Sequence, residues 1–211
     1  GAIRAFTRRP DPESAFELTP IGDIAGPVSW GRELRGVECV IHLAGRAHVL
    51  AKDPAAEKAF ERTNVQASVA LARAASASGV RRLVFVSSIG VHGVLSRRPF
   101  SATDIPAPTE RYADSKLQAE QSLRRVASET GLELVIVRPP LVYGPDAPGN
   151  FGRLVRLVNR GIPLPLAGID NRRSLVSRSN LVDLLLRCSD HPAAAGETFL
   201  VSDDHDLSTA D

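Results

Sequence analysis

Short apolar runs alternate along the chain with longer segments of helical pattern, and this alternation is what most restricts the fold. The runs at 37–43, 82–87 and 132–138 carry few polar residues, whereas the stretches at 54–79 and 111–130 read as helices. Strands that are apolar on both faces must be covered on both faces, and the stretches between them are long enough to be helical crossovers. We therefore predict an α/β fold built on a doubly wound parallel sheet.

Composition excludes several classes of function. The basic residues are scattered, the net charge is +2 and aromatic residues make up only 5% of the chain, so we expect no nucleic-acid partner. No apolar run approaches the roughly 20 residues that cross a bilayer, and the first residues lack the apolar block of a secretory signal. We expect a cytoplasmic protein with no membrane partner.

Cysteine and histidine residues give no sign of a metal site. Cys39 falls within a predicted strand and Cys188 near the end of a predicted helix, with no Cys-x-x-Cys spacing. Neither His42 nor His48 has a carboxylate or a second histidine at ligand spacing. We expect core thiols and structural histidines.

A tyrosine and a lysine at the start of the predicted helix 111–130 carry the strongest chemical signal. Tyr112 and Lys116 share one helix face, where an ammonium could favour the ionised phenol. An unperturbed phenol titrates near 10, so a lowered pKa would make Tyr112 a general acid/base. This spacing also arises by chance in many helices.

Ser88 would supply a third group, because it directly follows the strand at 82–87. Loops at the carboxyl ends of parallel strands are where binding sites form. We predict that Ser88 orients a substrate hydroxyl. The competing interpretation is a serine that caps backbone groups at the end of the strand.

The order of these motifs resembles the extended short-chain dehydrogenase/reductase family, in its UDP-glucose 4-epimerase-like branch of NAD-dependent nucleotide-sugar epimerases and dehydratases. The resemblance covers nearly the whole chain. It is carried by Val37 to Gly45, Asn64, Ser87-Ser88, the Tyr112 and Lys116 pair, Leu134 to Pro140, and Leu141-Val142-Tyr143-Gly144-Pro145. It implies a Rossmann-like NAD(P)-binding domain at 1–148 and part of a substrate-binding lobe at 149–211.

The family's first strand, glycine-rich turn and first helix have no counterpart here, and the first residues resemble its second strand. That turn normally holds the dinucleotide pyrophosphate. The chain also contains no Met. We expect a fragment truncated at both ends that binds dinucleotide poorly.

The resemblance implies roles for single residues. Tyr112 would take a proton from a sugar hydroxyl, while Lys116 would lower the pKa of the tyrosine and hydrogen-bond the nicotinamide ribose. The other cofactor contacts that it implies are Asp23 and Ile24 at the adenine, Leu43, Ala44 and Gly45 in the turn after a strand, Asn64 in a helix, and Pro139 against the nicotinamide. For Asn64, an amide on the helix surface remains an equally good interpretation.

Arg8 stands at the end of the first strand, where an acidic residue would bind a ribose 2′-hydroxyl and an arginine a 2′-phosphate. This favours NADP, whereas epimerases of the family generally hold NAD. The cofactor is therefore NAD or NADP.

On the substrate side, Asn150 and Arg173 match positions that touch the nucleotide diphosphate in related enzymes, and a guanidinium suits phosphate oxygens. Leu141 replaces a common asparagine and His92 a frequent tyrosine, which weakens any assignment of the sugar. Ser88 is followed by Ile89-Gly90 instead of the Asp-Glu pair of the family's 4,6-dehydratases, which argues against dehydration.

The sequence thus predicts a nucleotide-sugar 4-epimerase or 4-ketoreductase that uses bound NAD(P), with a nucleotide-diphosphate sugar as substrate. Two alternatives remain, because a fold does not fix a function. One is a non-catalytic, regulatory NAD(P)-binding protein, and the other is a reductase of a non-sugar alcohol. The resemblance further implies a possible homodimer formed through two long helices.

Overall fold

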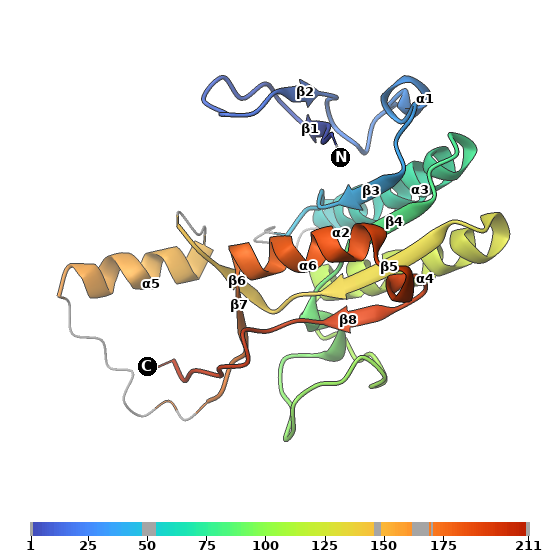
Figure 1. The fold of residues 1–211 in the computed structure, drawn as a ribbon. Coiled ribbons are helices and arrows are strands. Elements are labelled where there is room, and N and C mark those ends of the chain that lie inside the picture. Colours follow the sequence, from blue (N-terminus) through green and yellow to red (C-terminus); the bar gives the residue numbers. More distant parts are fainter. Residues whose placement is uncertain (1, 48–53, 146–148, 162–168, 170, 210–211) are drawn as a thin grey trace.

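A four-stranded parallel sheet forms the centre of the protein. The computed structural model describes residues 2–47, 54–145, 149–161, 169 and 171–209, and only the backbone of 54–56 and 149–150. The sheet order is β3 (Cys39–His42), β4 (Arg82–Val86), β5 (Glu133–Arg138) and β8 (Thr198–Leu200), with every neighbouring pair parallel (Figure 1). The predicted parallel α/β fold is confirmed.

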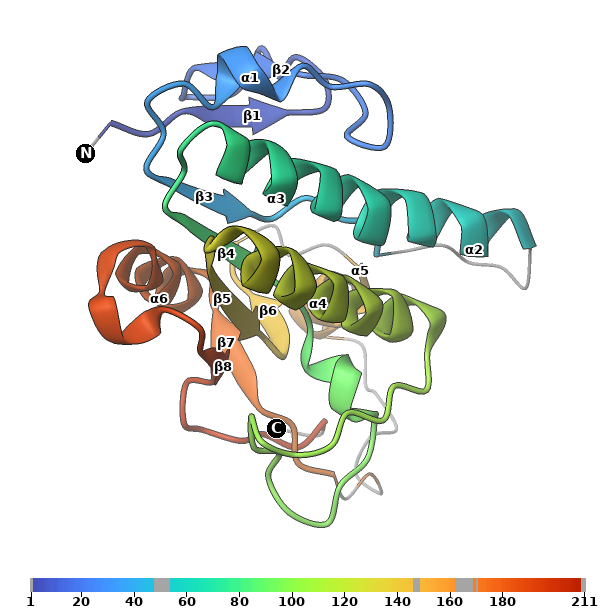
Figure 2. The same ribbon diagram turned by 90° about the vertical axis from the view of Figure 1, so that its right-hand side faces the viewer.

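Both faces of this sheet are covered, which explains why its strands lack polar alternation. Along β4, Leu83 and Phe85 point to one side and Val84 to the other, as the two-residue period of a strand requires. The first side packs against α3 (Ala67–Ala77) and α4 (Arg111–Thr130), and the second against α6 (Arg178–Asp190). Figure 2 shows α3 and α4 side by side on one face, with α6 on the other.

The two long helical segments end close to where the sequence predicts. One runs from α2 (Pro54–Phe60) through the π-helical segment η1 (Glu61–Gln66) into α3. The other, α4, spans the predicted 111–130 and ends at Gly131 in the left-handed region with φ of 75°, where its N–H bonds the Ala127 carbonyl. A glycine at this position ends the helix without steric penalty.

Several short elements escaped prediction because three or four residues give no readable periodicity. They are β2 (Leu18–Pro20), α1 (Trp30–Glu33), η2 (Ile89–His92), β6 (Leu141–Tyr143), β7 (Leu175–Ser177) and η3 (Pro192–Ala194). The first strand, β1 (Ala5–Thr7), pairs in parallel with β2, and the two form a small sheet of their own among the described residues.

The stretch after residue 148 contributes to the central sheet as well as to smaller elements. It contains α5 (Gly149–Asn159), β7, which pairs with β6, and both α6 and β8. Asp203 ties this part together by accepting bonds from the Tyr143 hydroxyl (2.7 Å), the Ser177 N–H (2.9 Å) and the Asn180 amide (2.8 Å). The domain boundary at 148/149 stays a prediction.

Candidate active site

Three parallel strands end at one edge of the sheet. His42 of β3 lies opposite Phe85 of β4, and Val86 of β4 lies opposite Val137 of β5. The predicted segments 43–45, 87–88 and 139 follow these strands and therefore lie along the same edge. A backbone bond from the Ile89 N–H to the Pro139 carbonyl (2.9 Å) joins two of them. This is the edge where parallel α/β sheets bind ligands.

Lys116 reaches this edge from α4. Its Nζ donates to the Val86 carbonyl at 2.9 Å and lies 4.6 Å from the centroid of the Phe85 ring, a cation–π contact. The side chain is buried, and burial lowers the pKa of Lys116 to about 8, while the charge of Glu120 acts in the opposite direction. Lys116 thus has a pKa below that of an exposed lysine but remains mainly a cation at pH 7.

Tyr112 lies in the first turn of α4, half-buried, with its ring centroid 6.4 Å from that of Phe60. Burial raises the pKa of the Tyr112 phenol. The lowered pKa expected from Lys116 is not seen in this arrangement, where the ammonium is engaged by the Val86 carbonyl and the Phe85 ring. Tyr112 is therefore a protonated phenol at neutral pH.

Ser88 caps the short helix η2, since its Oγ accepts a bond from the Gly90 N–H at 3.1 Å. The capping interpretation is therefore correct, and the hydroxyl hydrogen still serves as a donor. A Cβ placed on Gly90 would lie 3.3 Å from the Ala113 Cβ, so η2 packs tightly on α4 beside Tyr112. Ser88 and Tyr112 thus belong to two elements in direct contact.

Asn64 is the residue that holds the turn after β3. It is 1% exposed, and its Oδ1 accepts from the Arg46 N–H (2.8 Å) while its Nδ2 donates to the Arg46 carbonyl (3.0 Å). The same Nδ2 donates to Ser115 Oγ (2.9 Å) on α4. The surface-amide interpretation is excluded. Asn64 belongs to η1, and single π-helical turns are frequent at functional sites.

Gly45 lies against the same groups. A Cβ there would stand 3.1 Å from the Lys116 Nζ and 3.4 Å from the Asn64 Oδ1. Any larger side chain would press on the ammonium, whereas glycine leaves the backbone open to a ligand. The preceding Leu43, exposed by 65% although apolar, continues this open surface. The structure therefore brings Gly45, Asn64 and Lys116 together.

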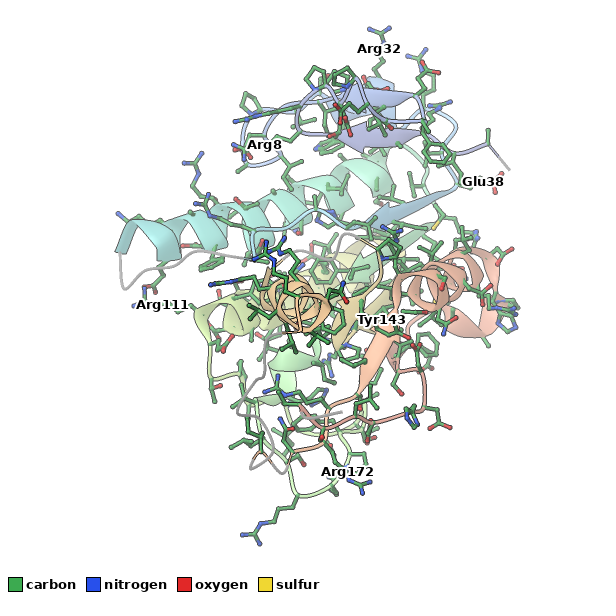
Figure 3. The ribbon with its side chains drawn as sticks, turned by 90° about the vertical axis from the view of Figure 1, so that its left-hand side faces the viewer. Arg8, Arg32, Glu38, Arg111, Tyr143 and Arg172 are labelled. Carbon is green, nitrogen blue, oxygen red and sulfur yellow. The ribbon has the colours of Figure 1, made fainter. Side chains whose placement is uncertain are left out.

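The residues predicted to lie at the adenine form a separate group near β1 and β2. The Arg8 guanidinium and the Asp23 carboxylate, 64% and 50% exposed, pair with each other at 3.0 Å, and Ile24 beside them is half-buried. Figure 3 shows Arg8 well apart from Arg111, which begins α4. The structure thus places these residues together, but away from Tyr112.

Arg173, one of the two substrate contacts predicted after residue 148, is not gathered with the others. The backbone of Arg173 forms an isolated bridge with Leu207 (2.9 and 3.1 Å), and its side chain is exposed. Its neighbour Arg172 lies far from Arg111 in Figure 3. Asn150 begins α5, but its side chain lies outside the described part of the chain.

Sequence reasoning missed a buried polar network beneath Ser88. The Arg138 guanidinium donates to both carboxylate oxygens of Glu120 (2.9 and 2.5 Å) and contacts Nε2 of His92 at 2.8 Å. Two signals could have revealed it: an arginine within the apolar strand before Pro139, and a glutamate one helical turn after Lys116.

The sequence analysis also missed a contact between His42 and Ser68 that supports η1. Nε2 of the buried His42 lies 2.8 Å from Ser68 Oγ, and that hydroxyl donates to the Asn64 carbonyl at 2.7 Å. Burial, and then the charge of Lys116, lower the pKa of His42 to about 3.

Because His42 is buried in its neutral form, we expect the protein to lose stability in acid. Its pKa is lower in the folded than in the unfolded state, so its contribution is complete above the unfolded pKa near 6.5 and is lost as pH falls towards 3. Between pH 6.5 and 4.5 we expect this residue alone to remove about 2–3 kcal/mol from the free energy of unfolding, measured by urea titration. His42→Gln keeps a donor but cannot titrate, and an equally steep loss in that variant would contradict the assignment.

The described residues contain no cluster of three or more His, Cys, Asp or Glu that could hold a metal ion. Within the same part of the chain, none of the helices combines the length and the apolar character needed to cross a membrane.

Comparison with known proteins identifies relatives along nearly the whole chain. The model of the NAD dependent epimerase/dehydratase family matches residues 2–202. A UDP-glucose 4-epimerase of Vibrio cholerae is 46% identical over 199 residues, which cover 92% of this chain and 60% of that protein. A dihydroflavonol 4-reductase of Zea mays is 31% identical, covering 97% of this chain and 64% of that protein. The chain thus spans less than two thirds of these relatives.

Among solved structures, MoeE5 in complex with UDP-glucose and NAD superposes with a TM-score of 0.80 at 25% identity. The match covers 98% of this chain and 69% of that one. The element order and parallel pairing described above therefore extend to a solved structure.

Proposed function

Because the chain belongs to the NAD dependent epimerase/dehydratase family, we propose that it is part of an enzyme that epimerises or reduces a nucleotide sugar at C4 with bound NAD. The observation that carries the proposal is the packing of Gly45, Asn64 and Lys116 at one sheet edge, beside the elements that hold Ser88 and Tyr112. The likeness to the Vibrio cholerae epimerase and to MoeE5 supports the same substrate class.

The residues present fit a nicotinamide cofactor. The exposed segment 43–46 is fixed by Asn64 and lies against Lys116, and a side chain at position 45 would displace the Lys116 ammonium that is proposed to hold the ribose. Lys116 would hold the ribose and Pro139 would lie against the nicotinamide. The hydride acceptor and donor for C4 would be NAD, when bound.

Residues of the chain itself would transfer the proton of the C4 oxygen. Tyr112, whose pKa is raised by burial, is in the form that donates a proton to a carbonyl oxygen at C4. Removal of a proton from the C4 hydroxyl needs the phenolate, which a positive charge near the ring stabilises, and Lys116 is the cation one helical turn away on α4. Ser88 would fix the sugar oxygen through its free hydroxyl hydrogen.

For the choice of cofactor we propose NAD, which the solved MoeE5 complex contains. Arg8, the residue that favours NADP, is paired with Asp23. Exposed ion pairs contribute little, about 0–1 kcal/mol, so a 2′-phosphate could separate this one. Comparing turnover with NAD and NADP in the full-length protein and in Arg8→Ala tests the choice, and a preference for NADP that Arg8→Ala removes would contradict it.

The proposal is tested by supplying the full-length protein with NAD or NADP and a panel of UDP-, GDP- and dTDP-sugars. Reduced-nicotinamide absorbance is followed and the sugars are separated by chromatography. An epimerised sugar without net cofactor change identifies an epimerase, and stoichiometric cofactor oxidation with a 4-keto sugar identifies a reductase. No conversion, with dinucleotide bound, would favour the regulatory alternative.

A reductase of a non-sugar alcohol is the second candidate, because the Zea mays relative is a dihydroflavonol 4-reductase. Arg173 separates the two. If its guanidinium binds a diphosphate, Arg173→Ala should raise KM for a nucleotide sugar about tenfold or more and leave kcat nearly unchanged, since hydrogen bonds to charged groups contribute about 1.5–3 kcal/mol. Arg172→Ala, at the equally exposed neighbouring position, is the matched control. Equal KM values for both variants would contradict the role of Arg173.

A further inference from the structure

The geometry points to Arg138 and His92 as positioning residues for Ser88, an inference that rests on the proposed function of that serine. Arg138 ends β5, His92 ends η2, and Ser88 begins the same short helix. The sequence analysis assigns neither residue a role in the site. Both act through the backbone that carries Ser88, and Glu120 of α4 completes their network.

The segment from Ser88 to His92 is attached at two points to consecutive residues. Near its start, the Ile89 N–H donates to the Pro139 carbonyl (2.9 Å), and at its end the His92 ring meets the Arg138 guanidinium (2.8 Å). Because residues 138 and 139 are rigidly linked, these two bonds fix both ends of η2 on β5.

The Arg138 guanidinium also connects the segment from Ser88 to His92 to helix α4. Arg138 is held by both oxygens of Glu120, which lies one turn after Lys116 on α4. Lys116 in turn bonds the end of β4 through the Val86 carbonyl. Helix α4 is therefore attached to β4 by Lys116 and to β5 by Glu120, and the distance between Ser88 and Tyr112 depends on both attachments.

The contact with Arg138 also fixes which ring nitrogen of His92 carries the hydrogen. A guanidinium only donates, so Nε2 of His92 must accept, and the hydrogen of the neutral ring is on Nδ1. Nδ1 is buried without a partner among the described residues. A second proton on the ring would place an N–H donor against the donor of Arg138 and break the attachment.

The charges around His92 act in both directions. Burial lowers its pKa, followed by the charge of Arg138 from β5, whereas Asp104 from the loop before α4 and Glu120 from α4 raise it. The net direction is downward, so the ring is neutral at pH 7. Phe100, stacked at 5.3 Å between ring centroids, covers the imidazole.

His42 provides a control within the same molecule. The only hydrogen of the Ser68 hydroxyl is donated to the Asn64 carbonyl, so His42 must donate to Ser68 from Nε2. The two buried histidines should therefore be opposite tautomers. Long-range ¹H–¹⁵N correlation spectra report this directly and require no turnover. A hydrogen on Nε2 of His92 would overturn the inference.

Two substitutions of His92 test its effect on Ser88. Gln places an amide oxygen near the position of Nε2 and keeps an acceptor for Arg138, whereas Phe keeps the ring stacked on Phe100 and removes the acceptor. We expect His92→Phe to lower kcat about tenfold or more, with KM and NAD affinity within about twofold of wild type, as for loss of a group acting in the transition state. His92→Gln should retain most of kcat.

The pH profile separates positioning from general destabilisation. Wild-type kcat should fall on the acid side below pH 6.5, and this limb should be absent from His92→Gln, which cannot titrate. Equal losses in both variants, no loss in either, or an acid limb retained in His92→Gln would overturn the inference. A wild-type enzyme inactive on every sugar would instead reject the proposed function, while the tautomer of His92 would still decide whether Arg138 holds it as described.

Discussion

Replacing Tyr112 with Phe in the full-length protein should lower kcat by about a thousandfold, because positioned general acid–base groups contribute roughly a hundredfold to ten-thousandfold. The change removes one oxygen from a half-buried ring and leaves its packing beside Phe60 intact. Cofactor affinity and the free energy of unfolding should therefore stay near wild type. Single-turnover kinetics with a nucleotide sugar would measure the loss in the chemical step.

The chain offers a matched control, since Tyr143 is its only other tyrosine. The Tyr143 hydroxyl donates to Asp203 at 2.7 Å, in the tie between β6, β7 and α6. Tyr143→Phe should remove about 1 kcal/mol of stability and change kcat by no more than a few-fold. If Tyr112→Phe kept more than a tenth of wild-type turnover, Tyr112 would not be the acid/base.

The second large effect concerns stability. Glu120 and Arg138 form a nearly fully buried ion pair, with side chains 0% and 3% exposed. Burial would raise the pKa of Glu120, but its bonds to Arg138 hold that pKa below its usual value. Glu120→Ala should lower the free energy of unfolding by about 3–5 kcal/mol, because it leaves an unpaired guanidinium in the core. Urea titration with a fixed m-value would measure the loss.

An exposed ion pair on α6 provides a comparison for how much burial changes the stability contribution of an ion pair. The Arg187 Nε and the Asp183 Oδ2 form an ion pair at 2.8 Å, and the side chains of Asp183 and Arg187 are 64% and 73% exposed. Asp183→Ala should change stability by only about 0.3–0.5 kcal/mol. Similar losses for Glu120→Ala and Asp183→Ala would show that the buried pair is accessible to water and would weaken its role in holding η2.

The parts of the fold that sequence could predict are those with long periodic signals. The boundaries of α4 agree with the predicted 111–130, and the three apolar strands fall where expected. The pairing of β8 with β5 and the separate β1–β2 pair could not be predicted, because contacts between distant short strands leave no local pattern.

For the site, motifs identified the residues but not their contacts. Asn64, Gly45 and Lys116 lie together because each follows or faces a strand end. The partner of Lys116 could not be read from helical spacing, because its ammonium donates to the carbonyl of Val86, a residue of a different element and 30 positions away. Glu120 looked like an ordinary helix residue, and His92 was noted only as replacing a frequent tyrosine, because their shared partner Arg138 is distant in sequence.

The π-helical segment that holds Asn64 makes the length of this helix as important as its composition. A π turn contains one residue more than an α turn does, so deleting Val65 or Gln66, which follow Asn64 in this segment, would restore regular helix. The core residues of α3 would stay in place, while everything before the deletion would rotate by about 100° around the axis. The Asn64 amide would then leave Arg46 and Ser115, although every motif residue would remain in the sequence. Among relatives, a single gap in this turn therefore marks proteins in which another group must hold the turn after β3.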